Sequence, residues 1–447
     1  MRVYLESLGC RLNYAEMAGL GRQLVEAGHQ LTVSAGDADI CVLNSCAVTG
    51  EAARKSRQLV RQLAQINPGV RLVVTGCYAT LEGEATAALP NVDLVVSNAR
   101  KDELLSLIAS HAADPRIAPR EPERLHLRPD AAEPGRTRAF VKVQDGCHNR
   151  CTFCIVTVAR GEERSRPAVE VVAEINGLHQ AGYQEAVLTG VHQGGYGRDR
   201  GEDLRGLMTA LLEGTAIPRL RLSSLEPFDL DTIFFALWQQ SGGRLMPHLH
   251  LPAQSGSDTI LRRMARRNRV ADFEALVAAA RAQIPGLTLT TDLIAGFPGE
   301  DEDQFGETVA FARRVGFAHI HVFPYSARAG TAAARFAGQV QETERRRRSR
   351  LLNELDAELG RTVRMNMLGQ VRPVLWENRS PQPDTSQLPA NTEVWSGLTD
   401  NYLRVRTVAP QGLDLHNRIV RTRLVGLMGD ELQGHLMVDG AQEEEGL

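Results

Sequence analysis

The chain has 447 residues, a hydrophobic content of 43% and a formal net charge of −3 at pH 7. This length predicts about three domains, and the hydrophobic content is sufficient for several packed cores. A net charge near zero does not indicate a nucleic-acid partner, so any basic surface has to be local. The N-terminus shows no apolar signal segment and the chain no run of about 18 apolar residues, which argues against secretion or a membrane span. Seven cysteines, an odd number grouped in motifs, argue against a disulfide framework and predict a reducing, cytoplasmic compartment.

Residues 1–112 alternate between strand and helix patterns. Short apolar runs predict strands at Arg2–Leu8, Asp39–Asn44, Arg71–Gly76 and Val92–Ser97. Helical spacing predicts helices at Asn13–Gly28, Glu51–Ile66 and Lys101–His111. This alternation predicts an α/β domain, a flavodoxin-like parallel sheet with helices on both faces.

Residues 113–136 are rich in Ala, Pro, Arg and Glu without periodicity, and we interpret them as a linker. A second alternating series occupies residues 137–368. Its expected strands are Ala139–Gln144, Ala186–Gly190, Arg219–Ser224, His248–Leu251, Leu287–Ile294 and His319–Pro324. Six strands are too few for a closed eight-stranded barrel and predict a partial (β/α)6 barrel, with its site at the C-terminal ends of the strands. Residues 369–440 have short alternating strands separated by Pro, Asn and Gly turns, which predicts a small all-β barrel.

Six of the cysteines form two groups of three. The compact group directly follows the first strand of the second series, with the spacing Cys-x3-Cys-x2-Cys, and consists of Cys147, Cys151 and Cys154. The dispersed group follows the first three strands of the chain and consists of Cys10, Cys46 and Cys77. Because the carboxyl ends of parallel strands meet at one edge of a sheet, the dispersed group can converge on one site. Thiolates hold iron–sulfur clusters or zinc, and three ligands leave one metal position open, which indicates an enzyme.

A zinc knuckle is the competing interpretation of the compact group. Structural zinc takes four ligands, and His148 is the only fourth candidate nearby. His148 directly follows Cys147, so its geometry as a ligand would be cramped. The ligand count therefore favours an iron–sulfur cluster, and a zinc-dependent, non-catalytic RNA-binding protein stays as a distant alternative.

The compact motif closely resembles that of the radical S-adenosylmethionine (SAM) superfamily. The resemblance implies a four-iron cluster whose free iron binds SAM, and reductive cleavage of SAM to a radical that abstracts hydrogen from an unactivated carbon. It also implies that Phe153 packs on the SAM adenine, with core packing as the alternative. Gly190 and Glu226 follow barrel strands where SAM would bind, and ordinary loop roles are equally compatible with their positions.

Further motifs narrow the resemblance to the methylthiotransferase family. Three stretches resemble the signatures of its N-terminal domain: Gly9–Asn13, Asn44–Thr49 and Thr75–Ala79. Five more follow the order of its radical-SAM domain: Gln144–Cys147, Arg160-Gly161 with Arg164–Arg166, Ser223–Pro227, Gln254–Ser257 and Gly296–Glu300. Leu398–Val405 resembles part of the TRAM domain, an RNA-binding barrel. The resemblance implies SAM and two 4Fe-4S clusters, one on each group of cysteines, with the cluster of the dispersed group supplying sulfur.

Three stretches resemble the branch that modifies threonylcarbamoyladenosine at tRNA position 37, adding a methylthio group to C2 of the adenine. They are Gly190–Gly197, His321–Ser326 and Thr399–Tyr402. The implied partners are tRNA, an electron donor and a sulfur donor, without DNA or a membrane. Neighbouring branches act on isopentenyladenosine in tRNA or on an aspartate of a ribosomal protein, and both remain alternatives. Ala253 and Arg267–Arg269 depart from the family pattern, and these departures bear on the substrate rather than on the reaction.

Three other features have mainly structural interpretations. Cys41 lies within an apolar run, which predicts a small buried side chain rather than a ligand. The run Arg345–Arg348 is interleaved with glutamates, which favours a solvated helix face over an RNA contact. Trp376 and Tyr402 are candidates for stacking on RNA bases, although aromatic residues in small barrels are more often part of the core.

Overall fold

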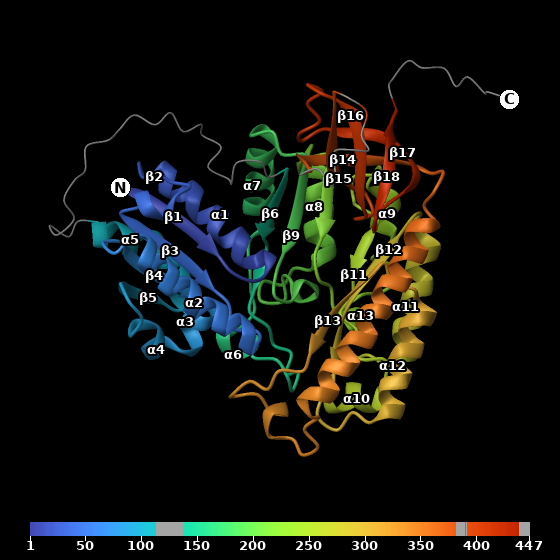
Figure 1. Cartoon of the computed structure of the whole chain (residues 1–447), viewed down its shortest axis with the longest axis horizontal. Coiled ribbons are helices and arrows are strands. Elements are labelled where there is room, and N and C mark those ends of the chain that lie inside the picture. The colour runs from blue at the N-terminus through green and yellow to red at the C-terminus, as the bar shows by residue number, and fades with distance from the viewer. Residues whose placement is uncertain (113–136, 381–388, 390, 438–447) are drawn as a thin grey trace.

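The computed structural model describes residues 1–112, 137–380, 389 and 391–437. A parallel sheet with helices, an open barrel and a small closed barrel follow one another along the chain (Figure 1). The expected linker at residues 113–136 lies outside the described residues. No helix among the described residues is both long and apolar enough to cross a membrane.

The N-terminal part is a parallel sheet in the order β2-β1-β3-β4-β5. Its strands are β1 (Arg2–Ser7), β2 (Gln30–Leu31), β3 (Ile40–Ser45), β4 (Arg71–Gly76) and β5 (Val92–Val96). Its helices are α1 (Arg11–Glu26), α2 (Gly50–Ile66), α3 (Cys77–Leu81), α4 (Gly83–Ala87) and α5 (Leu104–Ala112). Alternate residues of β3 belong to two apolar cores, one shared with α2 and the other with α1 and α5. Helices thus cover both faces, and the strand order confirms the predicted flavodoxin-like class.

The central part is an open barrel built from two parallel three-stranded sheets. One has the order β10-β9-β6, from β6 (Arg138–Lys142), β9 (Glu185–Thr189) and β10 (Arg219–Leu222). The other comprises β11 (His248–His250), β12 (Thr288–Ala295) and β13 (His319–Pro324). A bridge between Ser224 and His250 joins the two sheets. The barrel stays open between β6 and β13, and α1 of the N-terminal part packs against β6 (Figure 1).

Helices cover the outside of this barrel over one large apolar core. They include α7 (Ala168–Gln180), α8 (Leu204–Gly214), α9 (Ala236–Gln240), α11 (Val270–Gln283) and α12 (Glu302–Val315). The short α10 (Asp258–Arg263) follows β11, and the long α13 (Glu342–Met365) packs on β13. Within α13, Arg346 and Arg347 pair with glutamates at the surface, as expected for a solvated face, whereas Arg348 is buried against Glu300 at 2.8 Å.

The C-terminal part is a closed barrel in the order β14-β15-β16-β18-β17. Its strands are β14 (Val371–Arg379), β15 (Thr392–Thr399), β16 (Arg404–Pro410), β17 (Ile419–Met428) and β18 (Glu431–Leu436). Trp376 is fully buried in its core, so it is not a stacking platform for RNA. Arg219, at the start of β10, donates hydrogen bonds to the carbonyl oxygens of Pro373 at 2.7 Å and Leu398 at 3.3 Å. The small barrel therefore covers the N-terminal ends of the central strands, opposite the cysteine-bearing loop.

Candidate active site

The dispersed cysteines lie together at the carboxyl edge of the N-terminal sheet. Cys10 is the N-cap of α1, Cys46 follows β3 and Cys77 is the first residue of α3. Burial raises the pKa of Cys46 to about 11, and the neighbouring thiols of Cys10 and Cys77 contribute to the rise. The structure thus brings together three side chains that lie far apart in the sequence. Cys41 is fully buried in the core behind them, as predicted.

Two glycines make this convergence possible. Gly9 has a φ of +107°, and a Cβ at this position would lie 2.7 Å from Cys46 Sγ. Gly76 has a φ of +97°, and its Cβ would lie 2.3 Å from the carbonyl oxygen of Ser45. Both conformations favour glycine, and both spaces exclude any side chain. Each glycine directly precedes a cysteine, so the backbone turn itself sets the position of the thiol.

The compact cysteines occupy the loop between β7 (Gln144–Asp145) and α6 (Val156–Arg160). The backbone N–H of Asn149 donates to Cys147 Sγ at 3.3 Å, and that of Val156 donates to Cys154 Sγ at 3.4 Å. Arg266 Nη1 lies 3.9 Å from Cys151 Sγ. Hydrogen bonds to sulfur of this kind stabilise thiolates and tune the metal sites that they form.

The donor atoms of both groups fit iron–sulfur clusters. All seven cysteines are free of disulfides, and each group offers three soft thiol donors. Burial raises the pKa of Cys154 to about 12, so its thiol is neutral at physiological pH until a metal displaces the proton. Three donors without a fourth cysteine match a four-iron cluster with one open iron better than structural zinc.

Arg160, the last residue of α6, connects the two groups of cysteines. Its buried guanidinium donates to Asn13 Oδ1 at 2.7 Å, to Glu16 Oε1 at 2.9 Å and to Asp145 Oδ1 at 3.0 Å. Asn13 Oδ1 in turn lies 3.7 Å from Cys10 Sγ. One cation therefore contacts α1 of the N-terminal part and the strand that precedes the compact motif.

Neighbouring contacts strengthen this junction. Asn98 Nδ2 donates to the carbonyl oxygen of Ala159 at 2.8 Å and lies 3.7 Å from Cys77 Sγ. Burial alone would raise the pKa of Glu16, but nearby cations, Lys101 first and then Arg160 and Lys142, lower it well below its usual value. Glu16 is therefore a buried carboxylate held by several cations, the condition under which a buried charge is tolerated.

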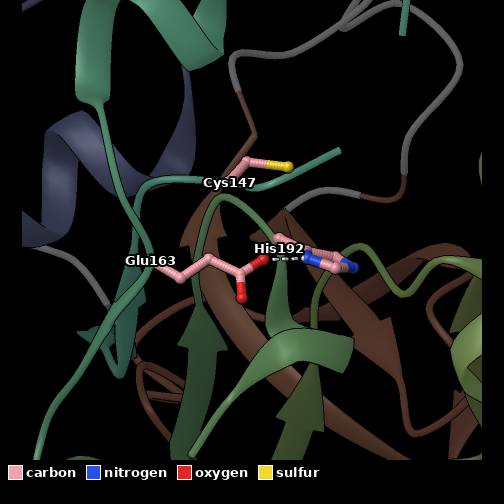
Figure 2. A group of neighbouring side chains, drawn as sticks. All are labelled: Cys147, Glu163 and His192. Carbon is pink, nitrogen blue, oxygen red and sulfur yellow. Dashed lines mark hydrogen bonds and ion pairs between the residues drawn. The ribbon is translucent and has the colours of Figure 1, made fainter. Parts of the chain in front are cut away.

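A buried imidazole lies directly beside the compact group. Figure 2 shows Cys147, Glu163 and His192, whose ligand atoms all lie within 4.8 Å of one another. His192 Nδ1 lies 2.6 Å from Glu163 Oε1, and its Nε2 lies 2.5 Å from Asp229 Oδ2. Burial would lower the pKa of His192, but hydrogen bonds to Asp229, Cys147 and Glu163 raise it to about 10. At neutral pH the ring is an imidazolium with both nitrogens occupied, which supports the cysteine loop and is unsuited to binding a metal.

The three residues expected beside SAM lie around the compact loop. Phe153 is partly buried against an apolar cluster that includes Met264 and Phe297. Glu226 forms an ion pair with Arg266, the residue that approaches Cys151. Gly190 follows β9.

A Cβ on Gly190 would lie 3.0–3.2 Å from the side chains of Gln193 and Gln144. Gln144 Oε1 accepts a hydrogen bond from the backbone N–H of His192 at 2.8 Å, so this tight packing also holds the backbone that carries the imidazolium. Sequence reasoning missed the roles of Arg160, Glu163 and His192. Arg160 and His192 lie within motifs that resemble the family, and Glu163 lies between two parts of one, but no local pattern indicates that they are buried ion-pair partners.

Comparisons with known proteins agree with this geometry. Residues 2–97 match the family described as uncharacterized protein family UPF0004, and residues 141–312 match the radical SAM superfamily. The chain is 34% identical to threonylcarbamoyladenosine tRNA methylthiotransferase MtaB of Bacillus subtilis, over 95% of this chain and 93% of that protein. The MtaB of Chlamydia pneumoniae is 36% identical, over 95% of this chain and 97% of that protein.

A second group of relatives carries a different name. The tRNA-2-methylthio-N(6)-dimethylallyladenosine synthase of Aromatoleum aromaticum is 35% identical, over 88% of this chain and 91% of that protein. Among solved structures, the radical SAM methyltransferase TsrM of Kitasatospora setae aligns with a TM-score of 0.54 at 14% identity, over 86% of this chain and 79% of that chain. At this identity the likeness concerns the fold alone.

The open barrel with its three-cysteine loop defines a radical-SAM enzyme. The match to full-length relatives then gives the family: the chain belongs to the tRNA methylthiotransferases. Members of this family are transferases that use SAM and 4Fe-4S clusters.

Proposed function

We propose that the chain adds a methylthio group to C2 of threonylcarbamoyladenosine at position 37 of tRNA, beside the anticodon. The observation that carries the proposal is the junction at Arg160, across which two groups of three free cysteines lie close together. A methylthio transfer needs a site that generates a radical and a site that delivers sulfur. The MtaB relatives of Bacillus subtilis and Chlamydia pneumoniae, named for threonylcarbamoyladenosine, support this choice of nucleoside.

The two groups of cysteines have different assignments. Cys147, Cys151 and Cys154 hold the 4Fe-4S cluster that binds SAM. Cys10, Cys46 and Cys77 hold the auxiliary 4Fe-4S cluster. When bound, the first cluster with SAM supplies hydrogen-abstracting radical chemistry, and the second supplies the sulfur that is transferred.

The surrounding residues of the chain orient these groups. Hydrogen bonds from the Asn149 and Val156 amides hold two thiolates of the compact loop, and Arg266 supports the third. The apolar side chain of Phe153 packs on the SAM adenine. Glu226 acts through Arg266 beside the SAM site, and the absence of a side chain at Gly190 lets Gln144 and Gln193 pack closely beside the loop.

The division of labour along the chain follows the three folded parts. Residues 1–112 carry the auxiliary site, residues 113–136 link it to the radical-SAM domain at 137–368, and residues 369–440 form a TRAM-like RNA-binding domain. The partners are a tRNA substrate, a reducing electron donor and a sulfur donor. A tRNA substrate also agrees with a cytoplasmic location.

Isopentenyladenosine in tRNA is the second candidate substrate, favoured by the dimethylallyladenosine synthase of Aromatoleum aromaticum at 35% identity. The substrate is tested by mass spectrometry of tRNA nucleosides from a strain lacking the gene, beside its parent. We expect loss of the methylthio form of threonylcarbamoyladenosine and accumulation of its precursor. Loss of the methylthio form of isopentenyladenosine would instead move the enzyme to the second substrate. If neither nucleoside changes, tRNA is the wrong substrate and a ribosomal-protein aspartate becomes the next candidate.

The metal content is tested separately. Anaerobically purified protein should contain about eight irons and a matching amount of acid-labile sulfide for two 4Fe-4S clusters. A colourless protein that takes up zinc but no iron would support the zinc-dependent RNA-binding alternative and contradict both clusters.

A further inference from the structure

The interior of the open barrel carries a row of polar side chains on β11, β12 and β13. Leu249, Leu289 and Ile320 belong to the core beneath the outer helices, so the residues that alternate with them face the interior. The polar residues in this row are His248, His250, Thr290, Asp292, His319 and His321. His250 Nε2 lies 3.3 Å from Asp292 Oδ1, and the ring centroids of His250 and His321 are 5.6 Å apart. His319 and His321 are exposed, so this side of the interior is open to solvent.

Arg11, the residue after Cys10, reaches into the same interior. Its guanidinium donates a hydrogen bond to the Tyr402 hydroxyl and lies 5.2 Å from the centroid of that ring. The Tyr402 ring centroid lies 4.7 Å from that of His248, the first imidazole of the row, so the Arg11–Tyr402 pair adjoins these histidines. Partial burial lowers the pKa of His321 to about 4, with further contributions from His319, His250 and Arg11. Arg11 therefore lies between the auxiliary cysteines and the polar row.

The charge of Arg11 lacks a carboxylate partner within the described part of the chain. Arg138 and Arg221 approach the same Tyr402 ring, at 5.7 Å and 4.8 Å, but each has its own carboxylate. Those partners are Glu377 for Arg138, at 2.8 Å, and Glu185 for Arg221, at 2.7 Å. Arg11 instead donates its hydrogen bond to the hydroxyl of Tyr402. A largely buried guanidinium without a counter-charge favours the binding of an anion.

We propose that Arg11 binds the carboxylate of the threonylcarbamoyl group and so selects this nucleoside over isopentenyladenosine; the inference rests on the proposed function. The threonine carboxylate is the one anionic group that distinguishes the two bases, because the isopentenyl group is apolar. In adenine a single ring nitrogen separates C2, which receives sulfur, from C6, whose amino group bears the substituent. A substituent bound next to Cys10 therefore keeps C2 close to the auxiliary site. The neutral imidazole of His321 offers a polar partner for the threonine hydroxyl or the urea.

The test compares three anticodon stem-loop RNAs that differ only at position 37. They carry threonylcarbamoyladenosine, its uncharged threonine carboxamide, or isopentenyladenosine. Their binding to anaerobically reconstituted protein is measured by fluorescence anisotropy. We expect the wild type to bind the carboxylate RNA about tenfold or more tighter than the carboxamide RNA, because hydrogen bonds between charged groups are the stronger kind.

The Arg11→Gln variant should bind the carboxylate and carboxamide RNAs within about twofold of each other, and Arg11→Lys should keep most of the preference. The matched control is Arg54→Gln, which removes an exposed arginine paired with Glu51 on α2 and should leave the preference unchanged. The iron and sulfide content of the Arg11→Gln variant shows whether Cys10 still binds the auxiliary cluster. If Arg11→Gln loses iron, Tyr402→Phe removes the hydroxyl that orients Arg11 without touching that loop, and it should also reduce the preference.

Two outcomes overturn the assignment. In one, Arg11→Gln, or Tyr402→Phe in its place, keeps the full preference for the carboxylate. In the other, the substitution weakens the binding of all three RNAs by the same factor, which indicates that Arg11 contacts an RNA phosphate. Failure of the proposed function looks different, because the wild type would then not methylthiolate the RNA that bears threonylcarbamoyladenosine.

Discussion

Arg160 Nη2 donates a hydrogen bond of 2.7 Å to Asn13 Oδ1, which itself lies 3.7 Å from Cys10 Sγ. Through this bond the radical-SAM domain contacts the auxiliary cysteine group. Arg160 ends the short helix that follows Cys154, so the two cysteine groups are separated by one turn of helix and two side chains. Its charge also opposes the rise in the pKa of Cys10 that burial causes. The junction thus fixes the distance between the two sites and places a cation beside the thiolates of the auxiliary site.

The first prediction concerns this junction. Arg160→Gln should reduce methylthiolated product about tenfold or more while the formation of 5′-deoxyadenosine changes about twofold or less. The reason is that the compact loop keeps its own hydrogen bonds, whereas a misplacement of about 1 Å between reacting groups costs roughly a hundredfold. Both products are quantified in one chromatographic assay, and the reduction potential of the auxiliary cluster is measured by EPR titration. Loss of the Arg160 charge should lower that potential.

The control for Arg160 is Arg164→Gln. Arg164 lies 3.9 Å from Asp145, but its side chain is 45% exposed, so its interaction is weak. This variant should behave as the wild type in both assays. An equal fall of 5′-deoxyadenosine and product in Arg160→Gln would show that Arg160 supports the whole fold rather than the alignment of the two sites.

The second prediction separates the two clusters. Replacing Cys10, Cys46 and Cys77 together by Ala should abolish the methylthiolated product, lower iron from about eight to about four per chain, and leave 5′-deoxyadenosine formation detectable. The compact group keeps its thiols, so SAM cleavage needs none of the replaced residues. Cys41→Ala is the matched control, because Cys41 is buried in the core and should retain full iron. Loss of SAM cleavage in the triple variant would contradict the division of labour.

The sequence predicted the positions of the cysteines because these depend on local patterns. Cys10, Cys46 and Cys77 each follow an apolar strand, and parallel strands bring their carboxyl ends to one edge. The contacts that connect the two cysteine sites could not be predicted from the sequence. Arg160 and Asn13 are 147 residues apart and Arg11 and Tyr402 are 391 apart, and such contacts depend on how domains pack rather than on periodicity.

Local exceptions to periodicity were also missed. The helical spacing of the sequence predicts a helix at Asp229–Gln240. The structure has only α9 in this range, because Pro227 begins a short 3-10 turn at Pro227–Asp229 and the chain between that turn and α9 is irregular. Asp229 is the last residue of that turn, and its carboxylate pairs with the ring of His192. Tyr402, interpreted as a core or stacking residue, adopts a φ of 74° and reaches a cluster of arginines. In both cases an interaction with a distant polar side chain outweighs the local preference.

The third prediction concerns Gly76. Gly76→Ala should lower the iron content by about half and reduce the free energy of unfolding by several kcal/mol. The φ of +97° alone costs roughly 1–3 kcal/mol for alanine, and the new Cβ would also lie 2.3 Å from the Ser45 oxygen. Chemical iron analysis and thermal unfolding measure the two effects. Gly83→Ala is the control, since a Cβ there meets no atom within 4 Å. A Gly76→Ala variant with full iron would show that the turn does not position Cys77.

The fourth prediction concerns the buried carboxylate of Glu185 on β9. Glu185 Oε1 accepts a hydrogen bond of 2.7 Å from Arg221 Nε inside the barrel. Burial alone would raise the pKa of Glu185, but Arg221, Arg219 and Arg138 lower it to about 2. Glu185→Gln keeps the shape of the side chain but leaves Arg221 and Arg219 without the carboxylate that they share. We expect a loss of about 3–5 kcal/mol in the free energy of unfolding at neutral pH, measured by urea titration.

The pH dependence gives this prediction a sign. The folded-state pKa of Glu185 lies below its ordinary value of 4.5, so its stabilising contribution is present above about pH 4.5 and is lost as pH falls through about 2. The difference in unfolding free energy between wild type and Glu185→Gln should therefore be largest above pH 4.5 and shrink below it. Comparing the two proteins at each pH cancels the acid lability of the clusters. Glu103→Gln, at an exposed ion pair with Arg100, should show little difference at any pH. A Glu185→Gln difference that stays constant from pH 6 to pH 3 would mean that the carboxylate does not titrate with a depressed pKa.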